Sequence, residues 1–254
     1  MNELHARSIH FVLVNTTHAG NIGAAARAMK TMGFASLRLV NPCRYQTADS
    51  LARASGADSI VRDAEVFSSL DDAIADCHQI YGTSARSRSL EWTVVTAREA
   101  AESIAVSLAS GQAAQEQGTG EKTAVVFGRE RSGLTNEELA LCQHRLWIPS
   151  NPEFSSLNLG SAVQVVAYEL AMAAAFGTVT DTEPATEPLA DAAAMARFYA
   201  HLEQTLVATG FLDPDNPRHL LRRLKRYFGR NQPTETELNI FRGILTSVTS
   251  QRDR

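Results

Sequence analysis

The first 176 residues alternate short β-rich runs with helical patterns, and this alternation limits the possible folds more than any other feature. The predicted strands are 8–15, 36–40, 79–83, 123–127 and 145–148. Helices are predicted at 23–32, 70–77, 97–108 and 161–176, with a further short helix capped by Thr135 and Glu138. Strands separated by helices pair in parallel and carry helices on both faces of the sheet. The sequence therefore predicts an α/β domain with a mostly parallel sheet.

A polar segment with two prolines, residues 177–189, separates this part from the rest of the chain. Such a composition is typical of a linker. The residues beyond it show no clear strand pattern, and helices are predicted at about 189–208, 217–228 and 234–250. Pro217 and Thr234 mark the starts of the last two. We expect one domain over residues 1–176 and a small helical region over 190–254.

The charge balance makes no general case for a nucleic-acid partner. The chain has 24 basic and 28 acidic residues, a formal net charge of −4, so a polyanion would need a local positive patch. The densest candidate is 218–230, which holds six basic and no acidic residues. There Arg222, Arg226 and Arg230 recur at helical spacing and predict a basic ridge. The same pattern is also typical of a solvated helix face, and both interpretations stay open.

Cysteine, histidine and hydropathy patterns exclude several classes of protein. The three cysteines are widely spaced without a C-x-x-C pair, which indicates a reducing, cytoplasmic setting and no disulfide framework. The seven histidines form no metal-ligand motif, so no metal is expected. The apolar run at 11–14 is too short for a signal peptide or a membrane span, so no membrane association is expected.

Three polar, glycine-bearing loops follow predicted strands, at 15–23, 128–133 and 150–160. Ligands of parallel α/β sheets bind at the carboxyl ends of the strands, so these loops are where chemistry is expected. The usual nucleotide signatures do not explain them. There is no P-loop and no G-x-S-x-G elbow, and Gly20 with Gly23 is a weak match to a dinucleotide fingerprint.

The three loops match another pattern. The runs NTTHAGNIGAAARAMK (15–30), FGRERSGLTNEEL (127–139) and IPSNPEFSSLNLGSAVQVVAYEL (148–170) resemble, in order, the three motifs of the SpoU branch of the SPOUT RNA methyltransferases. With TSARSR (83–88), they look most like the bacterial tRNA 2′-O-methyltransferases of that branch. The similarity spans roughly residues 7–176, and the tail matches more weakly.

The resemblance implies a fold and an activity. The C-terminal half of the domain would form a trefoil knot, with chain threaded through a loop near 123–160. The enzyme would be a homodimer that binds S-adenosylmethionine in the knot loops. It would methylate the ribose 2′-hydroxyl of the pyrimidine at nucleotide 32 in the anticodon loop of tRNA. The helical tail would help to hold the tRNA.

The resemblance also assigns roles to residues of this chain. Arg27, Asn21, Glu130 and Asn158 correspond to the catalytic polar residues of the three motifs. The residues expected to hold the cofactor are Thr83, Ser84, Ala85, Gly128, Ile148, Ser155, Ser156 and Leu157. Arg88, and secondarily Arg86, is expected near the RNA backbone, together with the basic ridge.

These residue types suit the chemistry. The sulfonium of the cofactor already activates the methyl group, so the protein has mainly to align the ribose hydroxyl with it. Arginine is a poor base because its pKa is about 12.5 or above. Arg27 is therefore expected to clamp a phosphate and hold the 2′-oxygen, while a phosphate oxygen or water takes the proton.

Other interpretations remain. The enzyme could act on another tRNA position or on ribosomal RNA, or the chain could be an RNA-binding module without catalysis. Taken singly, Arg27 could be a solvated helix residue, Asn158 a helix cap and Glu130 a surface ion-pair partner. The presence of all four catalytic polar residues argues against the inert module. Small residues in the helices at 23–32 and 161–176 permit close packing and favour the homodimer.

Overall fold

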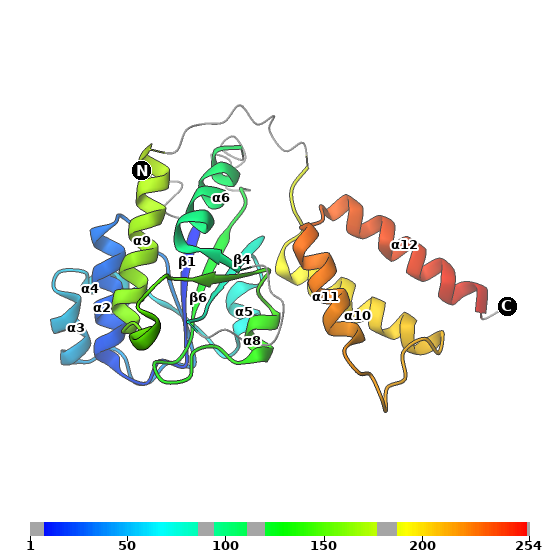
Figure 1. Ribbon diagram of the computed structural model, residues 1–254, viewed down its shortest axis with the longest axis horizontal. Helices are drawn as coiled ribbons and strands as arrows, with labels where there is room; N and C mark the ends of the chain where they lie inside the picture. Colours follow the sequence, from blue (N-terminus) through cyan, green and yellow to red (C-terminus); the bar gives the residue numbers. More distant parts are fainter. Residues whose placement is uncertain (1–7, 86–93, 111–119, 177–186, 253–254) are drawn as a thin grey trace. The chain divides into compact units, whose positions relative to one another are not determined.

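The computed structural model describes residues 8–85, 94–110, 120–176 and 187–252 (Figure 1). The chain divides into two compact units, Met1–Pro184 and Ala185–Arg254. None of the helices within these described ranges is both long enough and apolar enough to span a membrane. Each unit is described by itself below.

The first unit is built on a seven-stranded sheet in which every pair is parallel. The strand order is β3-β2-β1-β6-β4-β7-β5. The strands are β1 (Ile9–Val14), β2 (Leu37–Val40), β3 (Glu65–Phe67), β4 (Gln79–Thr83), β5 (Val94–Thr96), β6 (Thr123–Phe127) and β7 (His144–Trp147). The central strands β1 and β6 are buried along their whole length, which explains their continuous apolar sequence. The predicted parallel α/β sheet is confirmed.

Helices connect and cover these strands. They are α2 (Ala19–Thr31), α3 (Ala48–Ala54), α4 (Asp58–Arg62), α5 (Leu70–Ile74), α6 (Ala97–Ser110), α8 (Asn136–Ala140), α9 (Leu159–Phe176) and the 3-10 turn η1 (Pro152–Phe154). Helix α9 packs against both α2 and α6 and lies between them in Figure 1. Phe11 and Phe127 of the sheet join the core cluster that includes Val163 and Val166 of α9.

Several element predictions need correction. Helix α2 begins at Ala19 rather than at 23, and the two residues just before it, Thr17 and His18, are held by the distant carboxylate of Glu130. Helices α3 and α4 and strands β3 and β5 were not predicted, since they are short and only partly apolar. The capping box of Thr135 and Glu138 is confirmed. The knot stays a prediction.

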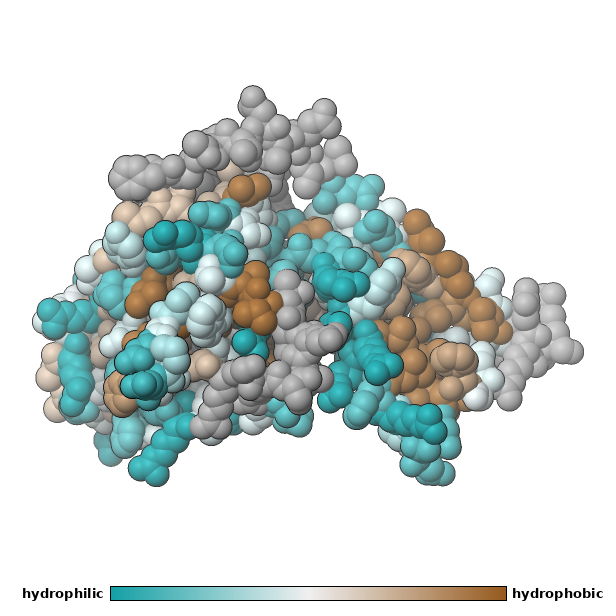
Figure 2. Space-filling model, in the orientation of Figure 1, coloured by the Kyte–Doolittle hydropathy of each residue, from teal (hydrophilic) through white to brown (hydrophobic). Residues whose placement is uncertain are grey.

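The second unit is a three-helix assembly of α10 (Ala192–Ala208), α11 (Leu220–Asn231) and α12 (Glu235–Arg252). Its core contains Phe198, Leu202 and Leu238, with Leu224 and Phe228 of α11 packed against them. Helix α11 begins at Leu220, not at 217, because Pro217 belongs to the turn before it. Apolar surface over α12 is visible in Figure 2. The exposed apolar residues of this helix include Ile240, Ile244 and Val248.

A polar cluster around the buried Arg38 lies where the amino ends of the strands meet. Arg38 is 5% exposed and binds both carboxylate oxygens of Asp76, at 2.6 and 3.0 Å. Lys122 donates to the same carboxylate at 2.8 Å. These two cations hold the pKa of Asp76 well below its usual range, although burial alone would raise it. His10 neighbours this cluster, is 5% exposed and bonds Ser36 Oγ at 2.6 Å.

The burial of His10 predicts a pH-dependent stability. Burial, with the nearby charge of Arg38, lowers the pKa of His10 from 6.5 to about 4. Between pH 4 and pH 6.5, His10 is protonated in the unfolded chain but neutral in the folded protein. Its contribution to the free energy of unfolding is therefore complete above pH 6.5 and is lost as the pH drops toward 4. The loss attributable to His10 should approach about 3 kcal/mol at pH 4.

Urea unfolding at pH 7 and pH 4.5 measures this effect. His10→Asn should lose the part of the pH dependence that lies between these values, whatever its stability at pH 7. Equal pH dependence in the wild type and the variant would contradict the assignment to His10.

Candidate functional site

The loops after β1, β6 and β7 meet at the carboxyl edge of the sheet, where the sequence predicts the chemistry. Two adjoining pockets open there. We call them the polar pocket, which includes Asn21 and Asn158, and the loop pocket, which includes Gly128 and Ile148. They share Glu130, Ser156, Leu157 and Leu159. A molecule held in one pocket therefore lies next to a molecule held in the other.

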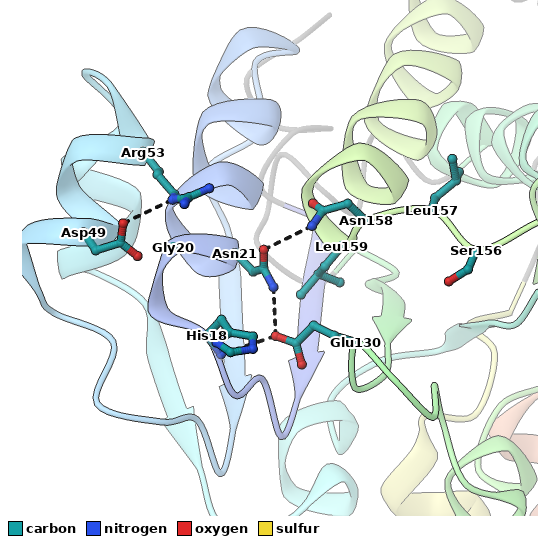
Figure 3. Close-up of a pocket in the computed structure, with 10 residues that line it drawn as sticks. All are labelled: His18, Gly20, Asn21, Asp49, Arg53, Glu130, Ser156, Leu157, Asn158 and Leu159. Atoms are coloured by element: carbon teal, nitrogen blue, oxygen red, sulfur yellow. Dashed lines mark hydrogen bonds and ion pairs between the residues drawn. The ribbon is translucent and has the colours of Figure 1, made fainter.

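A hydrogen-bonded chain joins the three motifs in the polar pocket (Figure 3). Asn21 Nδ2 donates to Glu130 Oε1 at 3.0 Å, and Asn158 Nδ2 donates to Asn21 Oδ1 at 3.3 Å. These partners are 109 and 137 residues apart in the sequence. Three of the four predicted catalytic residues are thus brought together.

Glu130 also occupies the amino end of α2. Its carboxylate accepts hydrogen bonds from Thr17 N at 3.3 Å and from His18 N at 3.4 Å, and another from Thr17 Oγ1 at 3.1 Å. A carboxylate here satisfies N–H groups that have no partner within the helix and faces the positive end of its dipole. Partial burial raises the pKa of Glu130, but the bonds from Asn21 and Thr17 outweigh it and lower the pKa below 4.5. Glu130 therefore stays ionised and fixes the first loop to the second.

Asn158 caps α9 as well as contacting Asn21. Its Oδ1 accepts from Gly160 N at 2.9 Å, which satisfies a free N–H in the first turn. A Cβ on Gly160 would lie 2.8 Å from Ala24 Cβ, so glycine lets α9 approach α2 closely here. The helix-cap interpretation of Asn158 is confirmed, and its catalytic role stays a prediction.

The loop pocket gathers every residue predicted to hold the cofactor. These are Thr83, Ser84, Ala85, Gly128, Ile148, Ser155, Ser156 and Leu157. They come from the ends of β4 and β6 and from the loop after β7. Leu146 and Ile148 supply apolar lining, and Ser84 N donates to Leu146 O at 3.0 Å.

Gly128 gives this pocket its shape. Gly133 N donates to Arg129 O at 2.9 Å and folds the loop back on itself, with Gly133 in the left-handed region at φ 69°. A Cβ on Gly128 would lie 2.2 Å from the backbone of Gly133 and of Leu134. The glycine thus permits two backbone segments to lie in contact beside an apolar slot. Backbone polar groups next to apolar side chains suit an adenosine with a charged tail, so the residues present fit S-adenosylmethionine.

None of the predicted arginines that the structure describes lines either pocket. Arg27 is an exposed residue of α2 and lines neither pocket. Six residues are about 1.7 helical turns, so Arg27 and Asn21 leave α2 in directions about 120° apart. Arg86 and Arg88 lie outside the described residues. The basic ridge of Arg222, Arg226 and Arg230 is exposed on α11 of the second unit.

The polar pocket also contains residues that were not predicted. Its volume is about 470 Å³, and His18, Asp49 and Arg53 help to line it (Figure 3). Arg53 Nε pairs with Asp49 Oδ1 at 3.2 Å on α3. Both were missed because α3 was not predicted. His18 lies within the first motif, and its place in that motif is the one signal that could have found it. Among the described residues, no group of three or more His, Cys, Asp and Glu side chains is placed to hold a metal.

Comparisons with known proteins agree with this geometry. Residues 8–168 match the SpoU rRNA Methylase family, and residues 193–254 match the family described as tRNA methyltransferase TrmJ, C-terminal domain. The tRNA (cytidine/uridine/adenosine-2'-O-)-methyltransferase TrmJ of Pseudomonas aeruginosa is 48% identical over 248 residues, which cover 94% of this chain and 93% of that protein.

Two further relatives extend over nearly the whole chain. The tRNA (cytidine/uridine-2'-O-)-methyltransferase TrmJ of Klebsiella pneumoniae is 46% identical and covers 96% of this chain and 98% of its own length. The crystal structure of TrmJ from Zymomonas mobilis ZM4 superposes with a TM-score of 0.77 at 32% identity, covering 94% of this chain and 98% of that one. The chain therefore belongs to the SpoU methylase family of methyltransferases, within its TrmJ branch.

Proposed function

We propose that this enzyme transfers a methyl group from S-adenosylmethionine to the ribose 2′-hydroxyl of the pyrimidine at nucleotide 32 of tRNA. The observation that carries the proposal is the hydrogen-bonded chain from Glu130 through Asn21 to Asn158, beside the glycine-shaped loop pocket. The named activity of the TrmJ relatives supports the substrate class.

The two adjoining pockets would bind the two reactants, one the cofactor and the other the ribose. S-adenosylmethionine, when bound, supplies an activated methyl group on a sulfonium. The loop pocket would hold its adenosine against Ile148 and Leu157, with Gly128 admitting backbone contact. The polar pocket would receive the ribose, and Asn21 and Asn158 would orient its hydroxyl, since their side chains are already fixed by Glu130 and by the first turn of α9.

Arg27 supports a homodimer. It is exposed on α2 outside both pockets of its own chain, so the proposed phosphate clamp would serve a site completed by a second copy. The small residues of α2 do not carry this argument, because Gly23, Ala25 and Ala28 are buried within the chain. The outer face of α9 supports the dimer better than these small residues do. Its aromatic residue Tyr168 is 47% exposed, and a second copy of the chain would cover it.

A charge on this face should separate the dimer. Tyr168→Arg would place a cation in the interface, and the cost of burying it unpaired should yield a monomer near 27.6 kDa and remove most activity. Light scattering measures the mass. Val66→Arg on β3, at another exposed apolar residue, is the control and should remain dimeric. A wild-type enzyme that is monomeric and active would refute the homodimer.

The basic ridge should carry part of the tRNA affinity and none of the chemistry. Replacing Arg222, Arg226 and Arg230 with Gln should weaken tRNA binding several-fold at low salt. The log–log salt slope should become shallower by roughly 0.7 to 0.9 for each phosphate that the variant no longer neutralises. Cofactor binding should not change, because no ridge residue lines the loop pocket. As a control, Arg197→Gln with Arg242→Gln should leave the slope unchanged. Identical affinity and slope in the triple variant would show that the ridge is only a solvated face.

Methyl transfer with labelled S-adenosylmethionine tests the function directly. The purified enzyme should methylate an unmodified tRNA transcript, and mass spectrometry of nuclease fragments should place the methyl group on the ribose of nucleotide 32. Incorporation at another tRNA position, or into ribosomal RNA alone, would overturn the assignment of the target. Binding of tRNA without transfer would favour an inert RNA-binding module.

A further inference from the structure

His18 occupies a helix position for which its side chain is poorly suited. It is the N-cap residue of α2, yet its imidazole makes no capping hydrogen bond. Asn, Asp and Ser are preferred at this position, because their side-chain oxygens accept a hydrogen bond from the first turn of the helix. Glu130 accepts from the N–H groups of Thr17 and His18 itself, just before the helix, so the His18 ring serves neither these groups nor the first turn. Capping therefore does not explain the histidine.

The imidazole of His18 lies in the polar pocket beside the groups that would hold the ribose. It lines this pocket together with Asn21, Glu130 and Asn158, and Figure 3 shows its ring next to the Glu130 carboxylate. Neither ring nitrogen forms a hydrogen bond within the described part of the chain, and the residue is exposed to the pocket. The ring is thus accessible to a molecule bound there.

The other ionisable groups around the pocket are poor proton acceptors. Glu130 is held ionised by hydrogen bonds that lower its pKa. Asp49 is paired with Arg53, and a guanidinium has no site that can accept a proton. Imidazole is the side chain that ordinarily titrates near neutral pH, which suits general base catalysis. The ionised Glu130, which accepts from His18 N, would also stabilise the imidazolium that forms.

We propose that His18 is a catalytic residue that accepts the proton of the 2′-hydroxyl during methyl transfer. This inference rests on the proposed function. The ribose oxygen forms a bond to the methyl carbon as the bond between this carbon and the sulfur breaks. The electron pair of the broken bond stays on the sulfur, which becomes a neutral sulfide. The O–H pair stays on the ribose oxygen, and the proton passes to a ring nitrogen of His18. No further reactant is needed.

His18→Asn separates catalysis from folding, because Asn is a preferred N-cap and should preserve the start of α2. The turnover number at saturating tRNA should fall by on the order of a hundred-fold. The wild-type rate should fall as the pH is lowered, because a protonated base accepts no proton, and this acidic limb should be absent in the variant. The dissociation constants of tRNA and S-adenosylhomocysteine should stay within a few-fold. Added imidazole should partly restore turnover in His18→Ala.

A readout independent of turnover is the NMR titration of the His18 ring. The chemical shifts of its ring should change when unmodified tRNA and S-adenosylhomocysteine bind, and those of His201 on α10 should not. A His18→Asn enzyme with wild-type turnover and an unchanged pH profile would overturn the proposal, as would an effect confined to tRNA affinity. If the wild type methylates no tRNA at all, the proposed function fails instead.

Discussion

Arg27→Ala should lower the rate of methyl transfer by on the order of a thousand-fold, because a fixed cation beside the reacting oxygen is among the largest contributions to such a step. Arg27 is exposed on α2, and its guanidinium has no partner within the described residues, so its removal should leave folding intact. The dissociation constant of S-adenosylmethionine should change by no more than a few-fold, because Arg27 does not line the loop pocket. Single-turnover kinetics and calorimetry measure the two quantities.

The control for Arg27→Ala is Arg62→Ala, which removes another exposed arginine, on α4, outside both pockets. It should be indistinguishable from the wild type. A mixture of Arg27→Ala with Asn158→Ala would also show which subunit Arg27 serves. With random pairing, about half of the dimers contain one chain of each variant. If Arg27 acts across the interface, each of these heterodimers has one intact site out of two. About a quarter of wild-type activity should then return. Near-normal turnover in Arg27→Ala would end its catalytic assignment.

Gly128→Val should weaken binding of S-adenosylmethionine by on the order of a hundred-fold. A Cβ at this position would lie 2.2 Å from the backbone of Gly133 and Leu134, and neither can move without opening the loop. The fold of the sheet should survive, because the change lies after β6 and not within it. Calorimetric titration gives the affinity, and thermal unfolding without ligand reports on the fold.

Gly243→Ala is the matched control for Gly128→Val. A Cβ on Gly243 would meet nothing within 4 Å, and alanine is the better helix former in α12. It should leave cofactor affinity unchanged. Wild-type affinity in Gly128→Val would mean that the cofactor does not lie against this loop.

The buried strands could be predicted well because one residue pattern dominates them. β4 and β6 have the predicted bounds, since their short apolar runs are flanked by polar residues or glycine. β3 and β5 have three residues each and form the edges of the sheet. Their conformation depends on pairing with β2 and β7, which the local sequence does not encode. α3 buries only Ser50 and Ala54, so its packing on α2 rather than its own pattern stabilises it.

The candidate site shows the same difference between what the local sequence encodes and what depends on packing between distant elements. The residues of the loop pocket were named from the family resemblance, whose motifs are contiguous in sequence, and the structure brings these loops to the same edge of the sheet. Arg53 could not be predicted, because its place in the polar pocket depends on α3 packing beside Gly20. Arg27 was predicted from its motif, but only the helical geometry of α2 shows that it points away from Asn21.

The central claim is that the 2′-hydroxyl of nucleotide 32 receives the methyl group. The most direct measurement uses a tRNA with a single 2′-deoxy substitution at nucleotide 32, compared with the same tRNA carrying the substitution at a neighbouring loop nucleotide. Our account predicts that the first substrate binds but incorporates no methyl group, whereas the second is methylated at nucleotide 32. Full incorporation into the first substrate would contradict it.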